Sequence, residues 1–224
     1  MTETRDEAAS TRRLQVEVFS DYTCPWCYIG HARLERLRRQ ERGVLELDVT
    51  WRPFEIHPEV PEDGMPVEEL PYSREQWETM MERLREQAED EGLEIGARPF
   101  VSNTHEALMA GARVQAERPD RFPTFHEGLF RAYFSEGRDL GDRSVILDVA
   151  RASGLDADDL DAALDRDDGE DALEATRREA RRLGISGTPT FVFGGTHAAV
   201  GARPVEALRQ AAERALEADE GAYA

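Results

Sequence analysis

Short apolar runs alternate with longer helical patterns along this chain. The first run, residues 14–20, alternates apolar and polar positions and predicts a strand. From Pro25 onward the apolar positions recur at helical spacing, with the arginines, Arg33 included, largely on the other side. A second strand is predicted around residues 45–52. The N-terminal quarter is therefore expected to form a strand, a helix and a second strand.

Helical patterns fill the middle of the chain. Ser73-Arg74-Glu75-Gln76 fits a capping box, and Gly92 and Gly154 follow predicted helix ends. An acidic run from Asp156 to Asp171 does not have the spacing of an EF-hand loop, so a solvated helix face is expected there. The predicted helices cover residues 73–91, 103–117, 122–135, 142–153, 156–165 and 168–183.

Glycines and a proline punctuate the C-terminal part. The segment Gly184–Phe193 contains a turn followed by a short apolar run that predicts a strand. Gly194-Gly195 then separates this strand from residues 196–200, which is the signal of a two-residue hairpin. A final amphipathic helix is expected at about residues 204–217.

The two cysteines of the chain lie three positions apart, in Cys24-Pro25-Trp26-Cys27, where the first strand gives way to the first helix. A helix N-terminus stabilises a thiolate through unpaired backbone N–H groups and the positive end of the dipole. Cysteines so placed can have their pKa lowered from about 8.5 to roughly 3.5–7.5. We therefore expect Cys24 to be a nucleophile of thiol–disulfide exchange. Cys27, within one turn on the same face, is expected to be the resolving thiol.

Three other interpretations of the cysteine pair compete. A closed zinc site takes four ligands, and the sequence has no second cysteine pair. His31 shares the helix face but is expected about 10 Å from Cys24, which is too far for one metal. Two buried, inert cysteines and an incidental structural disulfide stay open as alternatives. Redox chemistry is the leading interpretation, with neither a metal nor a cofactor expected.

A strand, CPWC, a helix and, far downstream, G-x-x-G-T-P followed by a hairpin and a terminal helix together resemble the thioredoxin fold. More narrowly, the chain resembles the DsbA family of thiol–disulfide oxidoreductases, in its cytoplasmic FrnE-like branch. The resemblance runs from about residue 14 to 218. The matching stretches are Phe19–Gly30, Trp51–Pro58, Leu129–Phe134, Gly137–Leu140 and Gly184–Phe193.

The resemblance implies an α/β structure in which a thioredoxin-like fold is interrupted by an all-helical insertion domain. In that family the pair matching Thr188-Pro189 has a cis bond and faces the disulfide. Its backbone pairs with the substrate chain in strand fashion and keeps metals off the thiols. Pro25 and Trp26 are expected to shape the site with them. The expected domains are a flexible arm (1–13), a thioredoxin-like domain (14–57 and 181–218), the inserted helical domain (58–180) and a C-terminal tail (219–224).

A buried acid is the remaining catalytic element of thioredoxin-like sites, and Glu17 is the candidate here. By alternation Glu17 points to the face opposite Val16 and Val18, which is unusual in a strand expected inside a sheet. It lies near the position where DsbA-like proteins carry an acid beneath the active site, if the spacing to Cys24 is allowed to differ by one residue. There it would pass a proton to or from Cys27. An exposed strand glutamate is an equally weighted alternative.

Two main classes of function follow. The first is a thiol–disulfide oxidoreductase or isomerase acting on protein or low-molecular-weight thiols and disulfides. The second is a thiol-dependent isomerase or transferase that resembles 2-hydroxychromene-2-carboxylate isomerases and kappa-class glutathione transferases. Those relatives usually keep a serine at the site and use bound glutathione, so Cys24 and Cys27 together favour the first class. A redox-gated binding protein or chaperone, binding without turnover, is a third interpretation.

The net charge of the chain limits which kinds of partner it can bind. The chain has 47 acidic residues against 28 basic ones, all arginine, for a net charge of −19. A surface this acidic disfavours nucleic acids and anionic membranes. Because the N-terminal region is polar and no apolar run reaches the length of a membrane span, we expect a cytoplasmic protein. The redox partner and the oligomeric state stay open, a homodimer included.

The acidic excess also suggests adaptation to a high-salt cytoplasm, where abundant cations screen self-repulsion. Plain solubility is the simpler explanation. Thermal unfolding at molar salt and at about 0.1 M salt separates the two. We expect the melting temperature to fall at the lower salt concentration, and an unchanged value would contradict the high-salt hypothesis.

Overall fold

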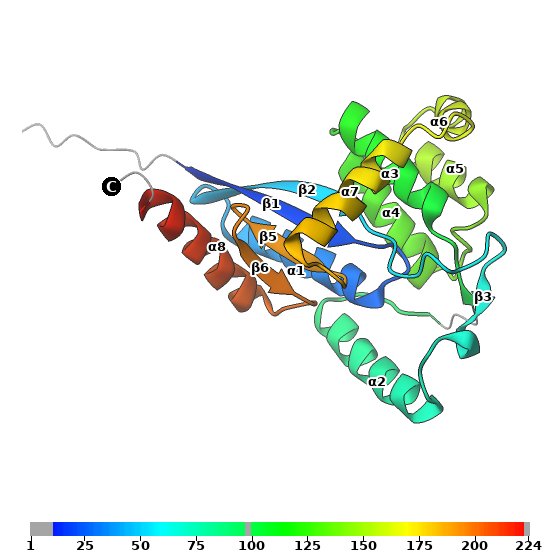
Figure 1. Cartoon of the computed structure of the whole chain (residues 1–224), viewed down its shortest axis with the longest axis horizontal. Coiled ribbons are helices and arrows are strands. Elements are labelled where there is room, and N and C mark those ends of the chain that lie inside the picture. The colour runs from blue at the N-terminus through cyan, green and yellow to red at the C-terminus, as the bar shows by residue number, and fades with distance from the viewer. Residues whose placement is uncertain (1–10, 97–99, 222–224) are drawn as a thin grey trace, which may run out of the picture.

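A four-stranded sheet with helices on both faces forms the centre of the computed structural model, which describes residues 11–96 and 100–221 (Figure 1). The strand order is β2-β1-β5-β6. The strands are β1 (Arg12–Ser20), β2 (Leu45–Pro53), β5 (Thr190–Phe193) and β6 (His197–Val200). β1 pairs in parallel with β2 and antiparallel with β5, and β5 pairs antiparallel with β6. The predicted α/β class is confirmed.

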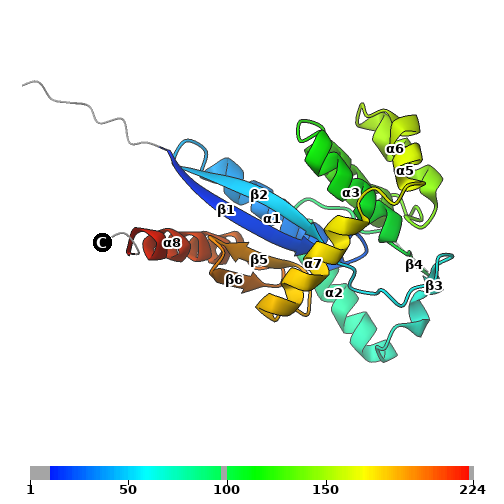
Figure 2. The same cartoon turned by 45° about the horizontal axis from the view of Figure 1, so that its top comes forward.

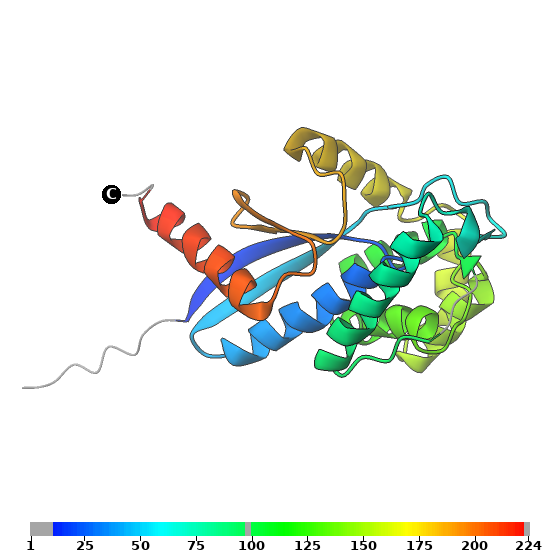
Figure 3. The ribbon, with the colours of Figure 1, turned by 90° about the horizontal axis from the view of Figure 1, so that it is seen from below.

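Different helices cover the two faces of this sheet. α1 (Pro25–Gln40) and α8 (Val205–Gly221) pack on one face, and α7 (Glu170–Leu183) packs on the other (Figure 3). Val16 and Val18 of β1 belong to the apolar cluster shared with α1 and α8. Phe19, which points the opposite way, packs with Ala180 of α7. The two-residue period of β1 thus explains how both faces are buried.

The other helices gather beyond one end of the sheet, far from α8 (Figure 2). Their aromatic core reaches into the thioredoxin-like part, because Tyr28 of α1 stacks on Phe130 and Phe134 with ring centroids 5.4 Å apart in each case. The two parts therefore share one apolar cluster. These helices are α2 (Arg74–Asp90), α3 (His105–Glu117), α4 (Phe122–Phe134), α5 (Arg143–Ala152) and α6 (Ala157–Leu164), and the connecting segments add β3 (Met65–Pro66), η1 (Val67–Glu69) and β4 (Phe100–Val101).

The local signals at helix ends are realised. Ser73 caps α2 through a bond from the Gln76 backbone N–H, while the Gln76 side chain accepts from the Ser73 backbone, which completes the predicted capping box. Gly92 and Gly154, which follow the ends of α2 and α5 as predicted, have positive φ values of 69° and 73°. Within the described part of the chain, none of the helices is long and apolar enough to span a bilayer.

The segment boundaries differ from the prediction in several places. Most of the predicted arm (1–13) lies outside the described residues, but Arg12 and Arg13 already belong to β1. At the other end α8 continues through Gly221, and only 222–224 of the predicted tail lie outside the description. The boundary between residues 180 and 181 falls inside α7, because that helix packs on both the sheet and α3.

The β5–β6 hairpin also differs from the expected two-residue turn. Phe193 pairs with His197, so the loop has three residues, Gly194, Gly195 and Thr196. Both glycines have positive φ, 56° and 71°, and the Thr196 backbone N–H bonds to the Phe193 carbonyl. One residue more than predicted is therefore needed to reverse the chain.

Arg33 of α1 is not on an exposed face, contrary to the sequence pattern. Its side chain is only 8% exposed, because the C-terminal end of α2 packs over it. The Arg33 Nε atom donates to Glu91 Oε1 at 2.8 Å, and its Nη1 atom donates to the Ala202 carbonyl at 2.6 Å. This arginine joins α1, α2 and the segment before α8, and so fixes α2 beside the start of α1.

Candidate active site

The two thiols lie at the start of α1, as the sequence predicts. Cys24 is the N-cap residue and Pro25 takes the first helical position, where a missing N–H costs nothing. Cys24 is 7% exposed, whereas Cys27 is fully buried. Both are free cysteines in this structure. One sulfur therefore lies at the surface of the site and the other lies beneath it.

The surroundings of the two thiols shift their pKa values in opposite directions. The pKa of Cys24 is lowered, first by a hydrogen bond from the Cys27 side chain and further by the contact with Thr188, although burial opposes the shift. The pKa of Cys27 is raised well above its usual value, first by burial and then by its bond to Cys24. The arrangement favours a thiolate at Cys24 and a protonated thiol at Cys27.

The loop before β5 lies directly against the outer thiol. The Thr188–Pro189 peptide bond is cis, and Cys24 Sγ lies 3.6 Å from the Thr188 carbonyl oxygen. Gly30 allows α1 to pack closely here, because a Cβ at that position would come within 3.1 Å of both Phe191 and Pro189. The structure thus brings the two motifs together across more than 160 residues of sequence.

A pocket of about 490 Å³ opens beside Cys24. This volume lies within the range of small-molecule sites. Its walls come from the start of α1, from the segment before and along α2, from β4 and from the Thr188 loop. The lining includes the aromatic residues Trp26, Tyr72, Trp77, Phe100 and Tyr133, the aliphatic residues Ile56, Leu70, Met80 and Met81, and the polar residues His57, Glu78 and Arg85.

Glu17 does not lie beneath the thiols, so the sequence-based proton-transfer role is wrong. It faces the side of the sheet that α7 covers, whereas α1 and its cysteines pack on the side of Val16 and Val18. Its carboxylate pairs with Arg52, whose Nε atom lies 2.7 Å away, and its side chain is 24% exposed. Glu17 is also not the fully exposed strand glutamate of the alternative interpretation, because it is partly buried and paired with Arg52.

The carboxyl group nearest this chemistry belongs to Asp21, which the sequence reasoning did not single out. Asp21 is 1% exposed and lies in the turn between β1 and α1. Its side chain accepts from the Thr23 backbone N–H at 3.0 Å and from the Ile56 backbone N–H at 2.8 Å. The bond to the second residue onward is that of an Asx turn, so the local sequence Asp-x-Thr was a usable signal.

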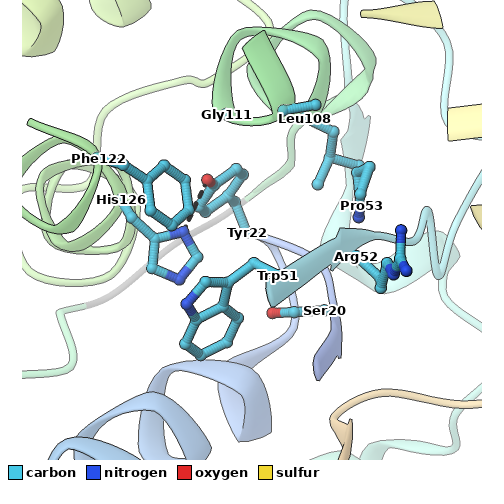
Figure 4. Close-up of a pocket in the computed structure, with 10 residues that line it drawn as sticks. Ser20, Tyr22, Trp51, Arg52, Pro53, Leu108, Gly111, Phe122 and His126 are labelled. Atoms are coloured by element: carbon cyan, nitrogen blue, oxygen red, sulfur yellow. Dashed lines mark hydrogen bonds between the residues drawn. The ribbon is translucent and has the colours of Figure 1, made fainter. Parts of the chain in front are cut away.

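His126 of α4 lies apart from the pocket beside Cys24. It is buried on α4, and its Nδ1 atom bonds to the Tyr22 hydroxyl at 2.8 Å (Figure 4). Trp51 and Phe122 lie against the same imidazole ring, beside a small cavity of about 20 Å³. Burial lowers the pKa of His126 well below its usual value. His126 therefore packs α4 against the turn that precedes Cys24 and does not face the pocket beside Cys24.

His105, the first residue of α3, lies between two carboxylates. Its Nδ1 atom is 2.9 Å from Glu55 and its Nε2 atom is 3.0 Å from Glu170. Arg177 of α7 contacts the same two carboxylates. The hydrogen bond to Glu55 raises the pKa of His105. This group, which we call the His105 latch, joins the segment after β2 to α3 and α7.

The His105 latch predicts a stability that depends on pH. Because the folded-state pKa of His105 is raised, its stabilisation is complete below the unfolded value of about 6.5 and is lost as pH rises through the folded value. We expect about 0.5–1 kcal/mol, since the side chain is partly exposed and the charges are screened. Denaturant unfolding of wild type and His105→Gln at pH 6 and pH 8 measures the difference.

Relative to His105→Gln, wild type is expected to lose this increment of unfolding free energy between the two pH values, because the buried His31 and His126, whose pKa values are lowered, contribute equally to both proteins. His57→Gln, at a histidine outside the latch, is the matched control. Equal pH slopes in wild type and His105→Gln would contradict the assignment. Glu55 does not interfere, because its lowered pKa makes its contribution fade only toward acid pH.

Comparison with known proteins agrees with this geometry. The family model of the DSBA-like thioredoxin domain matches residues 15–213. A probable DsbA oxidoreductase from Streptomyces coelicolor is 30% identical, with 91% of this chain and 90% of that chain covered and a TM-score of 0.81. The uncharacterised protein YwbO of Bacillus subtilis (strain 168) is 26% identical over 184 residues, which cover 82% of this chain and 88% of YwbO.

A more distant neighbour shares the architecture. A 2-hydroxychromene-2-carboxylate isomerase is 16% identical, with 92% of this chain and 98% of that chain covered and a TM-score of 0.72. At that identity the likeness concerns the fold alone. The family match spans the cysteine pair, the helical insertion and the cis-proline loop together. The chain belongs to the family of DSBA-like thioredoxin domains.

Proposed function

We propose that this protein is a thiol–disulfide oxidoreductase that acts on protein or small-molecule disulfides through Cys24 and Cys27. The observation that carries the proposal is the difference between the two thiols. Cys24 is the helix cap, borders the pocket and has a lowered pKa, while Cys27 is fully buried with a raised pKa. Disulfide exchange needs this pairing of a reactive thiolate with a second thiol that holds its proton until the first bond has formed.

The geometry supports a two-step exchange. The Cys24 thiolate attacks one sulfur of a substrate disulfide, which forms a mixed disulfide and releases the first substrate thiolate. Cys27 then loses its proton and attacks Cys24 Sγ, which releases the second substrate thiolate and leaves a Cys24–Cys27 disulfide. Two electrons pass from the protein to the substrate. The reverse sequence oxidises a substrate dithiol, so one site serves both directions.

The cis-proline loop supports the placement of a substrate chain. The Thr188 carbonyl lies beside Cys24 Sγ, and Gly187 and Thr188 form one wall of the pocket. A disulfide held between this loop and Trp26 would present its sulfur to Cys24. The description of the Streptomyces coelicolor relative as a probable DsbA oxidoreductase is consistent with this activity.

The aromatic lining of the pocket favours one second candidate, a thiol-dependent isomerase or transferase. Its volume and its Trp26, Trp77 and Phe100 walls suit a small aromatic molecule. Such an enzyme needs one reactive group at position 24 and a bound thiol cofactor such as glutathione. It has no use for Cys27, which makes the buried second thiol the observation against it.

Turnover assays separate the two candidates. Wild type is assayed for dithiothreitol-driven reduction of insulin and of a small aromatic disulfide, and for isomerisation of 2-hydroxychromene-2-carboxylate with glutathione. We expect disulfide reduction that depends on Cys27, and no isomerisation. If wild type shows no disulfide turnover and isomerisation persists in Cys27→Ser, the isomerase or transferase function would be favoured over the oxidoreductase function.

A further inference from the structure

Asp21 is a buried carboxylate that the exchange mechanism does not use. It precedes Cys24 by three residues and is anchored by hydrogen-bond donors. One oxygen accepts from the Thr23 backbone N–H at 3.0 Å and from the Thr23 hydroxyl at 3.1 Å, and the other accepts from the Ile56 N–H at 2.8 Å. Its backbone carbonyl accepts from the Cys24 N–H at 3.3 Å. Asp21 thus accepts four hydrogen bonds that help to hold the turn presenting Cys24.

Neutral hydrogen-bond donors, not a positively charged side chain, stabilise the carboxylate of Asp21. Burial raises the pKa of Asp21, and hydrogen bonds from Thr23, Ile56 and Thr104 oppose the shift only in part. Among the described residues, none of the ion pairs includes Asp21, whereas Glu17, Glu55 and Glu91 all have arginine partners. An unneutralised buried carboxylate is costly, so its presence next to a reactive thiol calls for a functional explanation.

We propose that Asp21 is a positioning residue that holds the Cys24 turn against the pocket wall and keeps the Cys24–Cys27 pair more reducing than it would otherwise be. The inference rests on the proposed oxidoreductase function. The carboxylate field acts on Cys24, where it opposes the stabilisation that Cys27 and Thr188 give the thiolate. A reduced pair carries a thiolate and an oxidised pair carries no charge, so a nearby carboxylate disfavours the reduced form.

The same residue links the thiol to the substrate pocket. Ile56, whose N–H Asp21 binds, lines the pocket together with Cys24 and Trp26. Thr104, the N-cap residue of α3, adds a contact from the helical domain. Asp21 therefore ties the turn that carries Cys24 to Ile56 of the pocket wall and to the first turn of α3.

The test is the reduction potential of wild type and Asp21→Asn, measured between pH 5 and pH 9 in defined thiol buffers. Asparagine keeps the size and removes the charge. We expect Asp21→Asn to shift the equilibrium toward the reduced pair about tenfold at pH 8, which is about 30 mV more positive. The shift should become smaller toward acid pH, as Asp21 and the Cys24 thiolate take up protons. The pKa of Cys24, followed by its alkylation rate, should fall in the variant.

Two matched variants serve as controls. Glu17→Gln removes a carboxylate from the other face of the sheet. Asp139→Asn removes a loop-anchoring carboxylate that accepts from Ser102 at 2.6 Å and from the Gly141 N–H at 2.9 Å. Both should leave the potential and the pKa of Cys24 unchanged. If Asp21→Asn lowers only the melting temperature and shifts neither quantity, Asp21 is a structural anchor and the proposal is wrong.

Failure of the variant to fold and failure of the proposed function can each be distinguished from failure of the Asp21 proposal. If Asp21→Asn does not fold, Thr23→Val keeps the charge and removes one donor. The ionisation of Asp21 should then appear at higher pH in the alkylation profile of Cys24, and an unchanged profile would overturn the proposal. If wild type forms no reversible disulfide, the proposed function fails, but the alkylation pKa of Cys24 still tests the action of Asp21 independently.

Discussion

We expect serine in place of Cys24 to abolish the proposed disulfide exchange, and serine in place of Cys27 to stop the exchange after its first step. A hydroxyl at position 24 has no accessible anion at neutral pH, so the rate falls by a factor of about 10³ or more. A hydroxyl at position 27 leaves the first attack intact but cannot release Cys24 from the substrate. Cys27→Ser therefore accumulates a mixed disulfide at Cys24, which Cys24→Ser cannot form.

Intact mass spectrometry after incubation with a small aromatic disulfide measures this difference directly. We expect one adduct on Cys27→Ser, transient or no adduct on wild type, and none on Cys24→Ser. Reducing agent should remove the adduct. An adduct on Cys24→Ser at Cys27 would reverse the two roles, and equal reactivity of both single variants would contradict the difference in burial.

Alanine in place of Glu91 destabilises the fold more than any exposed substitution on α2. The Glu91 side chain is 3% exposed and accepts from Arg33 at 2.8 Å and from Arg36 at 2.9 Å. Removing the carboxylate leaves the buried Arg33 guanidinium without its anionic partner. Breaking a buried pair in this way costs about 3–5 kcal/mol, which corresponds to a fall of roughly 10 °C in melting temperature for a domain of this size.

Glu89→Ala, two residues earlier on the exposed side of α2, is the control and should change the melting temperature little. Because α2 carries Trp77 and Met81 of the pocket wall, Glu91→Ala should also weaken the binding of pocket-sized aromatic disulfides. If both alanine variants melt at the same temperature, the Arg33–Glu91 pair does not hold α2 in place.

The secondary structure could be predicted from the sequence because its signals are local. The alternation in residues 14–20, the capping box at Ser73 and the glycine that follows α2 each involve neighbours within a few positions. The Cys24–Cys27 pair and the Thr188-Pro189 dipeptide could be recognised because each lies within a short sequence motif. Their contact across the fold followed only from the family resemblance.

What the sequence missed depends on packing between distant segments. Alternation correctly placed Glu17 and Val16 on opposite faces of the sheet, but it cannot say which helix covers which face. Because α1 with its cysteines covers the face of Val16, Glu17 lies away from the thiols. Arg33 is buried by a residue 58 positions away. No local pattern marks the pocket wall, because its members become neighbours only when α2 and β4 fold back over Cys24.

The most direct test of the redox assignment is the equilibrium of the Cys24–Cys27 pair with defined thiol buffers, followed by trapping and counting of free thiols. We expect one reversible intramolecular disulfide that forms in a two-electron step, with a potential between about −120 and −270 mV. Two cysteines that never join in a reversible disulfide within one chain would contradict it.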